Sequence, residues 1–304
     1  TEMENVTSVT QFILMGFPNI HEVEILFIVF LLIYLVTVFG NTLIIVLVYT
    51  DCHLHSPMYY FLSNLSFIEI SMTSSVAPKM LANFLSEKKT ISFAGCFSQL
   101  YFCFLMVTHD FILFAVMSYD RYEAICNPLR YSSIMTSKVM QSTCFVLLGG
   151  GFIMILLSLV LKARLPYCGP IVIHHYFCDS APLLYLVCAD IQLTELIDFV
   201  VSLVLLLGFL ALIVVSYAYI ISTIFWIPSA QDRQKAFVTS ASHFTVVSLG
   251  FVISISVYAR PSQVTSVYLN KILSVLSSIV TLLLNPFIFS LRNEQMKEAL
   301  KNAL

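Results

Sequence analysis

Hydrophobic residues in this chain gather into long runs, and short polar segments separate one run from the next. Seven runs reach the roughly 20 residues that a helix needs to cross a hydrocarbon layer of about 30 Å. Lipid cannot hydrogen-bond the backbone, so such runs are expected to be helical. The pattern therefore predicts seven membrane-spanning helices, at about residues 25–50, 57–82, 93–126, 139–161, 196–227, 236–258 and 272–291.

The composition favours a membrane protein. Of 304 residues, 59% are hydrophobic and 11% are charged, and the mean hydropathy is +0.92. Soluble domains carry about 25% charged residues, and a large soluble helical protein would need polar helix faces that these runs lack. The net charge of −2 argues against a nucleic-acid partner. We predict a single domain over residues 1–304 with an all-α membrane fold, a bundle of seven transmembrane helices in the lipid bilayer.

The segment after the last run predicts one further, shorter helix. In RNEQMKEALKNAL, residues 292–304, the apolar Met296, Ala299 and Leu300 recur at helical spacing, with basic residues elsewhere on the wheel. This pattern is typical of a short amphipathic helix that lies along the inner membrane surface. A flexible tail is the alternative.

Cysteine positions indicate which side of the membrane is extracellular. Lysines and arginines divide eight to seven between the two sides, so the positive-inside rule decides little. Cys96, Cys168, Cys178 and Cys188 all fall in loops on the N-terminal side, and disulfides persist only in oxidising compartments. Asn5 begins a glycosylation sequon on the same side. We therefore expect an extracellular N-terminus, although spacing alone leaves all three pairings of the four cysteines open.

The long connection at residues 162–195 is expected to be an ordered loop over the mouth of the bundle, because it contains cysteines and apolar residues.

Two carboxylates, Glu69 and Asp110, fall midway along the second and third runs. An ionisable group costs roughly 2.5–3.5 kcal/mol in a membrane span, so both are candidates for function. They either share a proton, as in a pump, or hold a cation such as Na⁺. The remaining alternative is hydrogen bonding to neighbouring polar side chains. Asp198, near the outer end of the fifth run, could snorkel to water.

The third run ends in Asp120-Arg121-Tyr122, at the predicted cytoplasmic boundary. The Asp120 carboxylate can neutralise the Arg121 guanidinium, which could also swing into a crevice between helices. The triplet would then be an element with two arrangements. The alternative is a snorkelling arginine that anchors the helix end.

Catalytic motifs such as G-x-S-x-G, H-E-x-x-H and the P-loop are missing from the sequence, so we do not expect an enzyme. A transporter would need broken helices, and Gly149-Gly150-Gly151 is the one candidate break.

Several segments, in order along the chain, carry a family resemblance: Gly40-Asn41, HSPMYYFLSNLSFIE at 55–69, MSYDRYEAICNPLRY at 117–131, Ser216-Tyr217, KAFVTSASH at 235–243 and NPFIFSLRN at 285–293. With them, the sequence resembles the olfactory (odorant) receptors, which are rhodopsin-like G-protein-coupled receptors, and its long cysteine-rich loop resembles the tetrapod-type (class II) branch. The resemblance covers essentially the whole chain. It implies a single seven-transmembrane receptor domain in the plasma membrane, located in the cilia of olfactory sensory neurons.

The resemblance also implies the disulfides Cys96–Cys178 and Cys168–Cys188. It implies coupling to a heterotrimeric stimulatory G protein, with an olfactory-type α subunit and β and γ subunits, that raises cyclic AMP. Glu69 and Asp110 match the family's intramembrane acidic pair, which favours Na⁺ as an allosteric ion over a proton pump; no other cofactor is implied. The residues expected to take part in activation are Asp120, Arg121, Tyr122, Tyr217 and His243.

Four features depart from the family pattern. Glu123 stands where a small or aliphatic residue is usual, and so it is expected to give Arg121 a further carboxylate partner. The sixth-helix motif FYG appears as Gly250-Phe251-Val252, Ser240 replaces a cysteine, and Phe289 replaces a tyrosine. These changes concern the details of activation and not the family.

By resemblance, the ligand lies between the third, fifth, sixth and seventh helices, below the long loop. The expected lining is apolar with a few hydroxyls and no charge, as is common for small-molecule sites. An amine would require a carboxylate at the level of Cys103, and none is expected there. We therefore predict a small, neutral, hydrophobic volatile as ligand, rather than an amine or a peptide, oriented by Thr108, Ser254 or Tyr258. The expected lining residues are Cys103, Phe104, Val107, Thr108, Ser202, Leu205, Phe251, Ser254, Ile255, Tyr258, Val275 and Ser278.

Overall fold

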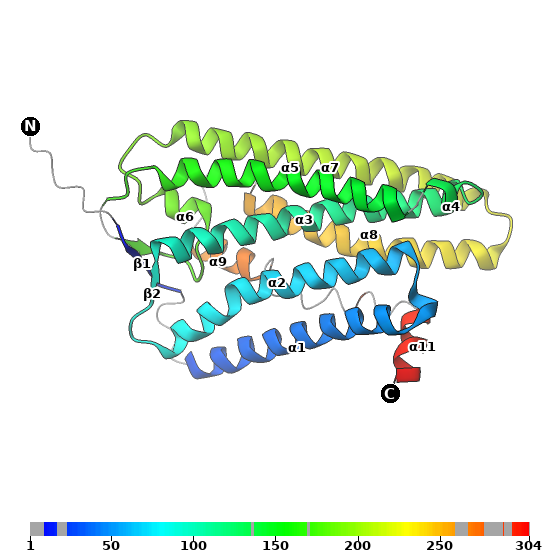
Figure 1. The fold of residues 1–304 in the computed structure, drawn as a ribbon, viewed down its shortest axis with the longest axis horizontal. Coiled ribbons are helices and arrows are strands. Elements are labelled where there is room, and N and C mark those ends of the chain that lie inside the picture. Colours follow the sequence, from blue (N-terminus) through cyan, green and yellow to red (C-terminus); the bar gives the residue numbers. More distant parts are fainter. Residues whose placement is uncertain are drawn as a thin grey trace, which may run out of the picture.

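The computed structural model describes residues 9–16, 23–134, 137–168, 171–258, 267–276, 288 and 294–303. Long helices that run side by side form the body of the molecule (Figure 1). The predicted all-α fold, a seven-helix bundle with a short C-terminal helix, is confirmed. In the described residues the bundle helices are α1 (Val23–Thr50), α2 (Pro57–Leu85), α3 (Phe93–Cys126), α5 (Ser137–Ala163), α7 (Gln192–Trp226), α8 (Ala230–Tyr258) and α9 (Val267–Val275).

Helix α3 lies at the centre of the packing. It contacts α2, α5, α7 and α8, while α1 packs on α2 and α9 packs on α8. The start of α3 is set locally, because the Ser92 hydroxyl accepts a hydrogen bond of 3.1 Å from the Gly95 N–H and so caps the first turn. Pro57 begins α2, at a position where its missing N–H costs nothing. A single central helix therefore passes between the two ends of the bundle.

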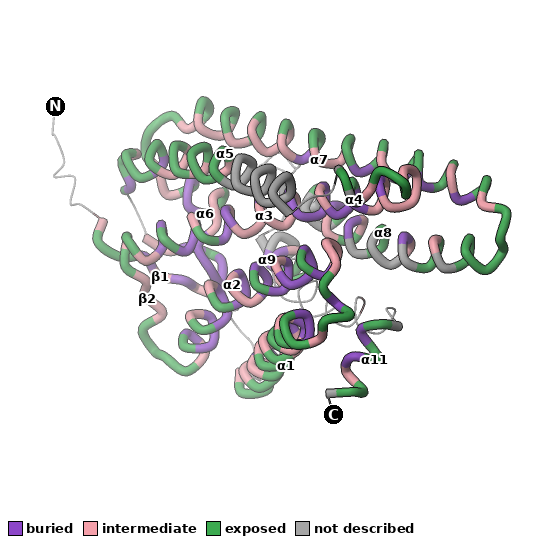
Figure 2. Tube along the Cα trace, turned by 45° about the vertical axis from the view of Figure 1, so that its right-hand side comes forward, coloured by how far each residue is buried: buried purple, intermediate pink, exposed green. Residues whose placement is uncertain are grey.

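The outer faces of the bundle are apolar. Figure 2 shows exposed residues along α1 and α7, and they include Phe39, which is 71% exposed, and Val204, which is 65% exposed. Such a surface is unfavourable in water and suits hydrocarbon. By length and composition α1, α3 and α7 can each cross a membrane within the part of the chain that the structure describes. The chain is therefore a membrane protein.

A small sheet, which the sequence did not suggest, covers one end of the bundle. Strand β1 (Gln11–Leu14) lies between β2 (Thr90–Ser92), to which it is antiparallel, and β3 (Val172–Ile173), to which it is parallel. The strand residues Phe12, Leu14 and Ile173 are fully buried. The N-terminal segment, the connection before α3 and the long loop thus close the same end of the bundle (Figure 1).

The C-terminal helix α11 (Glu294–Ala303) packs against protein at the other end. Met296 and Ala299, which were expected to face the membrane surface, are 0% and 4% exposed, and α11 contacts α1 and the short helix η1 (Cys52–Leu54). The Tyr59 hydroxyl donates a hydrogen bond of 2.7 Å to Gln295 Oε1. The described part of α11 is therefore a packed element of the bundle.

Some predicted residues cannot be assessed in this structure. The inner part of the seventh predicted span, residues 277–287, lies outside the described residues. The same holds for six predicted positions or their side chains, namely Asn5, His243, Ser254, Tyr258, Ser278 and Phe289.

Candidate functional site

The predicted ligand-binding positions of α3 lie on the part of the helix nearer the small sheet. Cys103 is 7% exposed and Thr108 is 9% exposed, while Phe104 and Val107 are half-buried. The Thr108 hydroxyl donates a hydrogen bond of 2.9 Å to the Phe104 carbonyl. Its proton is therefore engaged within the helix, and its oxygen remains able to accept a hydrogen bond.

The long loop descends onto this face of α3. Tyr176 is 1% exposed and Phe177 is 8% exposed, and both belong to one apolar cluster with Cys103 and side chains of α1 and α2. Val275 of α9, another predicted lining residue, packs against the same cluster. The structure thus brings Cys103 and Val275 together, with loop residues as the neighbours that the sequence did not identify.

Other predicted lining residues are less closely associated with this cluster. The Phe251 ring packs on Phe111 with a centroid distance of 4.7 Å, about two turns further along α3 than Phe104. Ser202 and Leu205 of α7 are half-buried. Ile255 is 38% exposed, so the structure does not enclose it with the others.

Two disulfides fix the loop. Cys96 in the first turn of α3 is bonded to Cys178, and Cys168 is bonded to Cys188; this is the pairing that the family resemblance implied. The Cys178 N–H also donates a hydrogen bond of 3.0 Å to Gln99 Oε1. Residues on either side of Cys178 are therefore held directly against α3.

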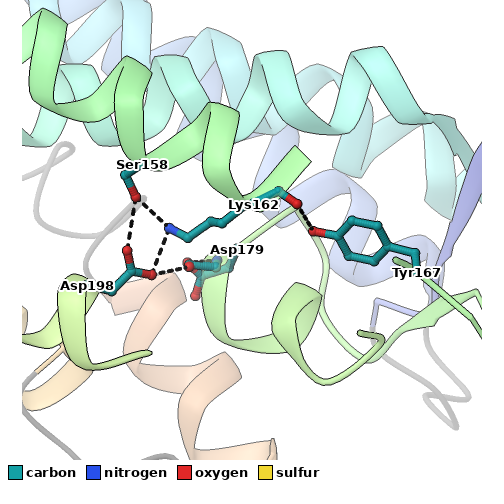
Figure 3. A network of polar contacts seen from close by, with 6 residues as sticks. Ser158, Lys162, Tyr167, Asp179 and Asp198 are labelled. Carbon is teal, nitrogen blue, oxygen red and sulfur yellow. Dashed lines mark hydrogen bonds and ion pairs between the residues drawn. The ribbon is translucent and has the colours of Figure 1, made fainter. Parts of the chain in front are cut away.

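A charged network lies beside the predicted ligand site (Figure 3). The Lys162 ammonium at the end of α5 is 2.7 Å from an Asp198 carboxylate oxygen on α7 and donates a hydrogen bond of 3.1 Å to the Ser158 hydroxyl. The other Asp198 oxygen accepts a hydrogen bond of 3.0 Å from Ser158. Ser180 of the short helix α6 (Ser180–Leu184) also donates to Asp198, at 3.1 Å. The network therefore joins α5, α7 and the loop.

Two sequence predictions are corrected by this network. Asp198 was expected to snorkel to water; instead it pairs with a lysine whose side chain is 5% exposed. The lining was expected to carry no charge, but the Lys162 ammonium lies 5.7 Å from the centre of the Phe104 ring. Asp179 is close enough to Cys103 for an electrostatic interaction. The physical reason is that Lys162 and Asp198 lie at the ends of α5 and α7 and Asp179 lies in the loop between them, so their proximity depends on the path of that loop and cannot be read from the separate apolar runs. The sequence did contain a signal for this ion pair: a lysine directly follows the fourth apolar run, and an aspartate lies near the start of the fifth.

The environment of Asp179 raises its pKa. Burial is the main cause and the nearby Asp198 carboxylate adds to it, whereas the Ser180 N–H and the Lys162 charge act in the opposite direction. Asp179 Oδ1 accepts a hydrogen bond of 2.8 Å from that N–H, which caps α6. The carboxyl group thus caps α6, and the residue as a whole is half-buried.

At the C-terminal end of α3, Arg121 and Asp120 form an ion pair, with Arg121 Nε 3.0 Å from Asp120 Oδ2. Asp120 is 1% exposed, and its other oxygen accepts a hydrogen bond of 2.8 Å from the Tyr131 hydroxyl. Burial and the Asp120 charge raise the pKa of Tyr131, so the phenol stays a donor. Tyr131 lies in α4 (Tyr131–Ile134) and was not identified from the sequence.

Tyr122 and Tyr217, two other predicted activation residues, make contacts with α7 and α8. The Tyr122 ring contacts Tyr219 of α7 at 5.7 Å. The Tyr217 hydroxyl donates a hydrogen bond of 3.4 Å to the Ser240 carbonyl of α8 and lies within electrostatic range of Arg121. These contacts join α3, α7 and α8 next to the guanidinium.

Glu123 does not give Arg121 the expected second carboxylate. It accepts a hydrogen bond of 3.1 Å from the Asn127 side chain, and the ion pair that Arg121 forms within the described residues is with Asp120. Residues two apart on a helix do not face each other, whereas residues four apart do. The expectation was therefore wrong, and Glu123 instead stabilises the last turn of α3.

The two carboxylates predicted to lie within the membrane are on α2 and α3. Glu69 is 1% exposed. One oxygen of Asp110 is buried without a hydrogen-bond partner among the residues that the structure describes. A buried oxygen of this kind is costly unless a proton or a cation satisfies it. This Asp110 oxygen therefore fits a bound cation or proton.

Comparisons with known proteins agree with this arrangement. The family described as "Olfactory receptor" matches residues 30–304. Olfactory receptor 6J1 of Homo sapiens is 49% identical over 296 residues, covering 97% of this chain and 85% of the relative. Olfactory receptor 6Y1 of Homo sapiens is 46% identical, covering 100% and 94%. Olfactory receptor 6E1 of Mus musculus is 44% identical, covering 98% and 96%. The chain therefore belongs to the olfactory receptor family of rhodopsin-like G-protein-coupled receptors, and it is a receptor rather than an enzyme.

Proposed function

We propose that this receptor binds a small, neutral, hydrophobic volatile on the α3 face bounded by α7, α8, α9 and the long loop. The observation that carries this proposal is the apolar wall around Cys103, formed by a cluster in which Phe177 of the loop and Val275 of α9 pack with α3. Such a wall suits an apolar ligand held by few polar contacts. Family membership supports an odorant as ligand and a G protein as partner.

The partner that we propose is a stimulatory, olfactory-type G protein with its β and γ subunits, which raises cyclic AMP. The Arg121–Asp120 pair at the cytoplasmic end of α3 supports this role. Among the described residues Arg121 pairs with Asp120 and lies near Tyr217, so a change in the spacing of α3, α7 and α8 would alter its contacts. Asp120, Arg121, Tyr122, Tyr217 and His243 are the residues that we assign to coupling.

The test is cyclic AMP in cells that express the full chain, exposed to a panel of neutral and charged volatiles with surface staining in parallel. We expect a saturable rise for some neutral volatiles. Responses to charged volatiles alone would contradict the ligand class. A rise in calcium through another G protein, without cyclic AMP, would contradict the partner. Uptake of labelled ligand without either signal would favour a transporter.

Tyr131→Phe is expected to raise basal cyclic AMP about two- to tenfold. The lost hydrogen bond reaches a charged acceptor, and such bonds contribute about 1.5–3 kcal/mol. Because that bond holds Asp120 in position, its loss loosens the restraint on Arg121. Tyr49→Phe, at an exposed tyrosine of α1, is the matched control. An unchanged basal level at equal surface expression would show that Tyr131 does not restrain the pair.

We also propose that Glu69 and Asp110 hold Na⁺ as an allosteric ion. An ion that prefers one receptor arrangement must alter ligand affinity, typically about fivefold or more. Replacing external Na⁺ by a large organic cation is expected to shift the half-maximal odorant concentration in the wild type and not in Asp110→Asn. Glu87→Gln, in an exposed loop, serves as control. A wild type indifferent to Na⁺ would leave the proton as the bound species.

We place the receptor in the plasma membrane of olfactory cilia, with the N-terminus outside and a glycan on Asn5. The disulfides on the N-terminal side of the bundle support this orientation, since they need an oxidising compartment. Glycosidase treatment is expected to lower the apparent mass of the wild type but not of Asn5→Gln. A wild type without any shift would contradict the glycan.

A further inference from the structure

The position of Asp179 is fixed from both sides. Its neighbour Cys178 is bonded to Cys96 and donates a hydrogen bond to Gln99, so it is held on α3 one turn above Cys103. Its other neighbour, Ser180, donates a hydrogen bond of 3.1 Å to Asp198 on α7. Asp179 is therefore held between α3 and α7, at the level where the predicted ligand-binding residues begin.

The nearby cation is already engaged. The Lys162 ammonium pairs with Asp198 at 2.7 Å, donates to Ser158 at 3.1 Å and lies over the Phe104 ring. A lysine has three N–H donors, and the neighbours that two of them reach are Ser158 and Asp198. The Lys162–Asp198 pair is close to neutral as a unit, so Asp179 is left as an additional carboxylate beside this pair (Figure 3), near enough to Cys103 to interact with it electrostatically.

The Asp179 and Thr108 side chains present acceptors. A carboxylate offers about four acceptor sites, and within the described residues the donor that reaches Asp179 is the Ser180 N–H. The Thr108 hydroxyl, deeper on α3, donates its proton to the Phe104 carbonyl. Donors nearby include the weak S–H of Cys103 and the buried His175 imidazole, which stacks on Tyr176, so Asp179 and Thr108 are the positions where a ligand hydroxyl meets an acceptor.

We propose that Asp179 selects ligands with a hydrogen-bond donor, and that the ligand class is the volatile alcohols, whose hydroxyl Asp179 accepts. This inference rests on the proposed function and specifies its ligand. An aldehyde or an ether of the same shape would desolvate the carboxylate without giving it a donor, and sites built to bind a hydroxyl reject such analogues strongly. A protonated amine would have to give up the hydration of a full charge to reach this buried site, a cost that a neutral alcohol does not meet.

The test compares ligands on matched carbon skeletons, linear, branched and aromatic, each presented as alcohol, aldehyde, methyl ether and amine. Cyclic AMP is recorded against dose for the full-length receptor. For responsive skeletons, we expect the alcohol to act at a concentration at least tenfold below that of the aldehyde and ether. In Asp179→Asn this ratio is expected to fall about tenfold or to invert, because the amide can donate to a carbonyl.

Controls separate selection from folding. Asn can cap α6 as Asp does, and Asp190→Asn makes the same change at an exposed position of the same loop. If Asp179→Asn fails to reach the surface, Asp179→Ser, which also caps a helix, replaces it. Equal potency of alcohols and aldehydes in the wild type, or an unchanged ratio in both variants, would overturn the inference and leave the receptor function intact. Amines more potent than alcohols would also overturn it. Silence to every volatile would overturn the proposed function as well.

Discussion

Replacing Arg121 by alanine is expected to abolish the odorant-induced rise in cyclic AMP while leaving the receptor at the cell surface. Arg121 lies at the C-terminal end of α3, its side chain is 17% exposed, and Asp120 is its ion-pair partner within the described residues. Alanine removes the group that we assign to the G protein. It also leaves Asp120 with the Tyr131 hydroxyl as a donor, so the carboxylate is not orphaned and the fold should persist.

Arg121→Lys distinguishes charge from geometry. Lysine keeps the charge but lacks the planar fork of the guanidinium, so we expect a response reduced about tenfold or more rather than a normal one. Arg130→Ala, at an exposed arginine in the following turn, is the matched control and should respond normally. A full response of Arg121→Ala at wild-type surface level would remove Arg121 from the coupling site and leave it as a helix-end anchor.

The helices of this fold could be predicted because each depends on local sequence. The third apolar run was placed at residues 93–126, and α3 spans Phe93–Cys126. The run is long, and a capping serine precedes it. Elsewhere the boundaries differ by a few residues, as in α8, which begins at Ala230 rather than at 236. That first stretch, AQDRQK, is polar, and a hydrophobicity argument cannot detect a helix that continues beyond the membrane.

The features that escaped prediction all depend on contacts between distant residues. Strand β1 pairs with segments that lie about 80 and 160 residues further along the chain, and it is too short for a periodic signal. Lys162 and Asp198 stand at opposite ends of the long loop, so their pairing requires the path of that loop. The charge of the candidate ligand site was missed for the same reason.

The Lys162–Asp198 pair leads to the second large effect. Asp198→Asn is expected to destabilise the receptor by about 3 kcal/mol, because it leaves an ammonium whose side chain is 5% exposed without its ion-pair partner. Lys162→Met should cost less. The Asp198 side chain is 24% exposed and keeps hydrogen bonds from Ser158 and Ser180. The measurement is thermal unfolding of the purified receptor in detergent, together with surface level in cells.

The double variant Lys162→Met with Asp198→Asn provides the decisive comparison. If the cost of Asp198→Asn comes from an unpaired buried cation, removing that cation should restore stability, and the double variant should unfold at a higher temperature than Asp198→Asn alone. Additive losses would instead mean that the two residues stabilise the bundle independently. Asp179 also interacts with Lys162 through its charge, so a small loss in Asp198→Asn would indicate that Asp179 takes over as counterion. In that case the carboxylate assigned to the ligand would be occupied, and the preference for alcohols should weaken in the same variant.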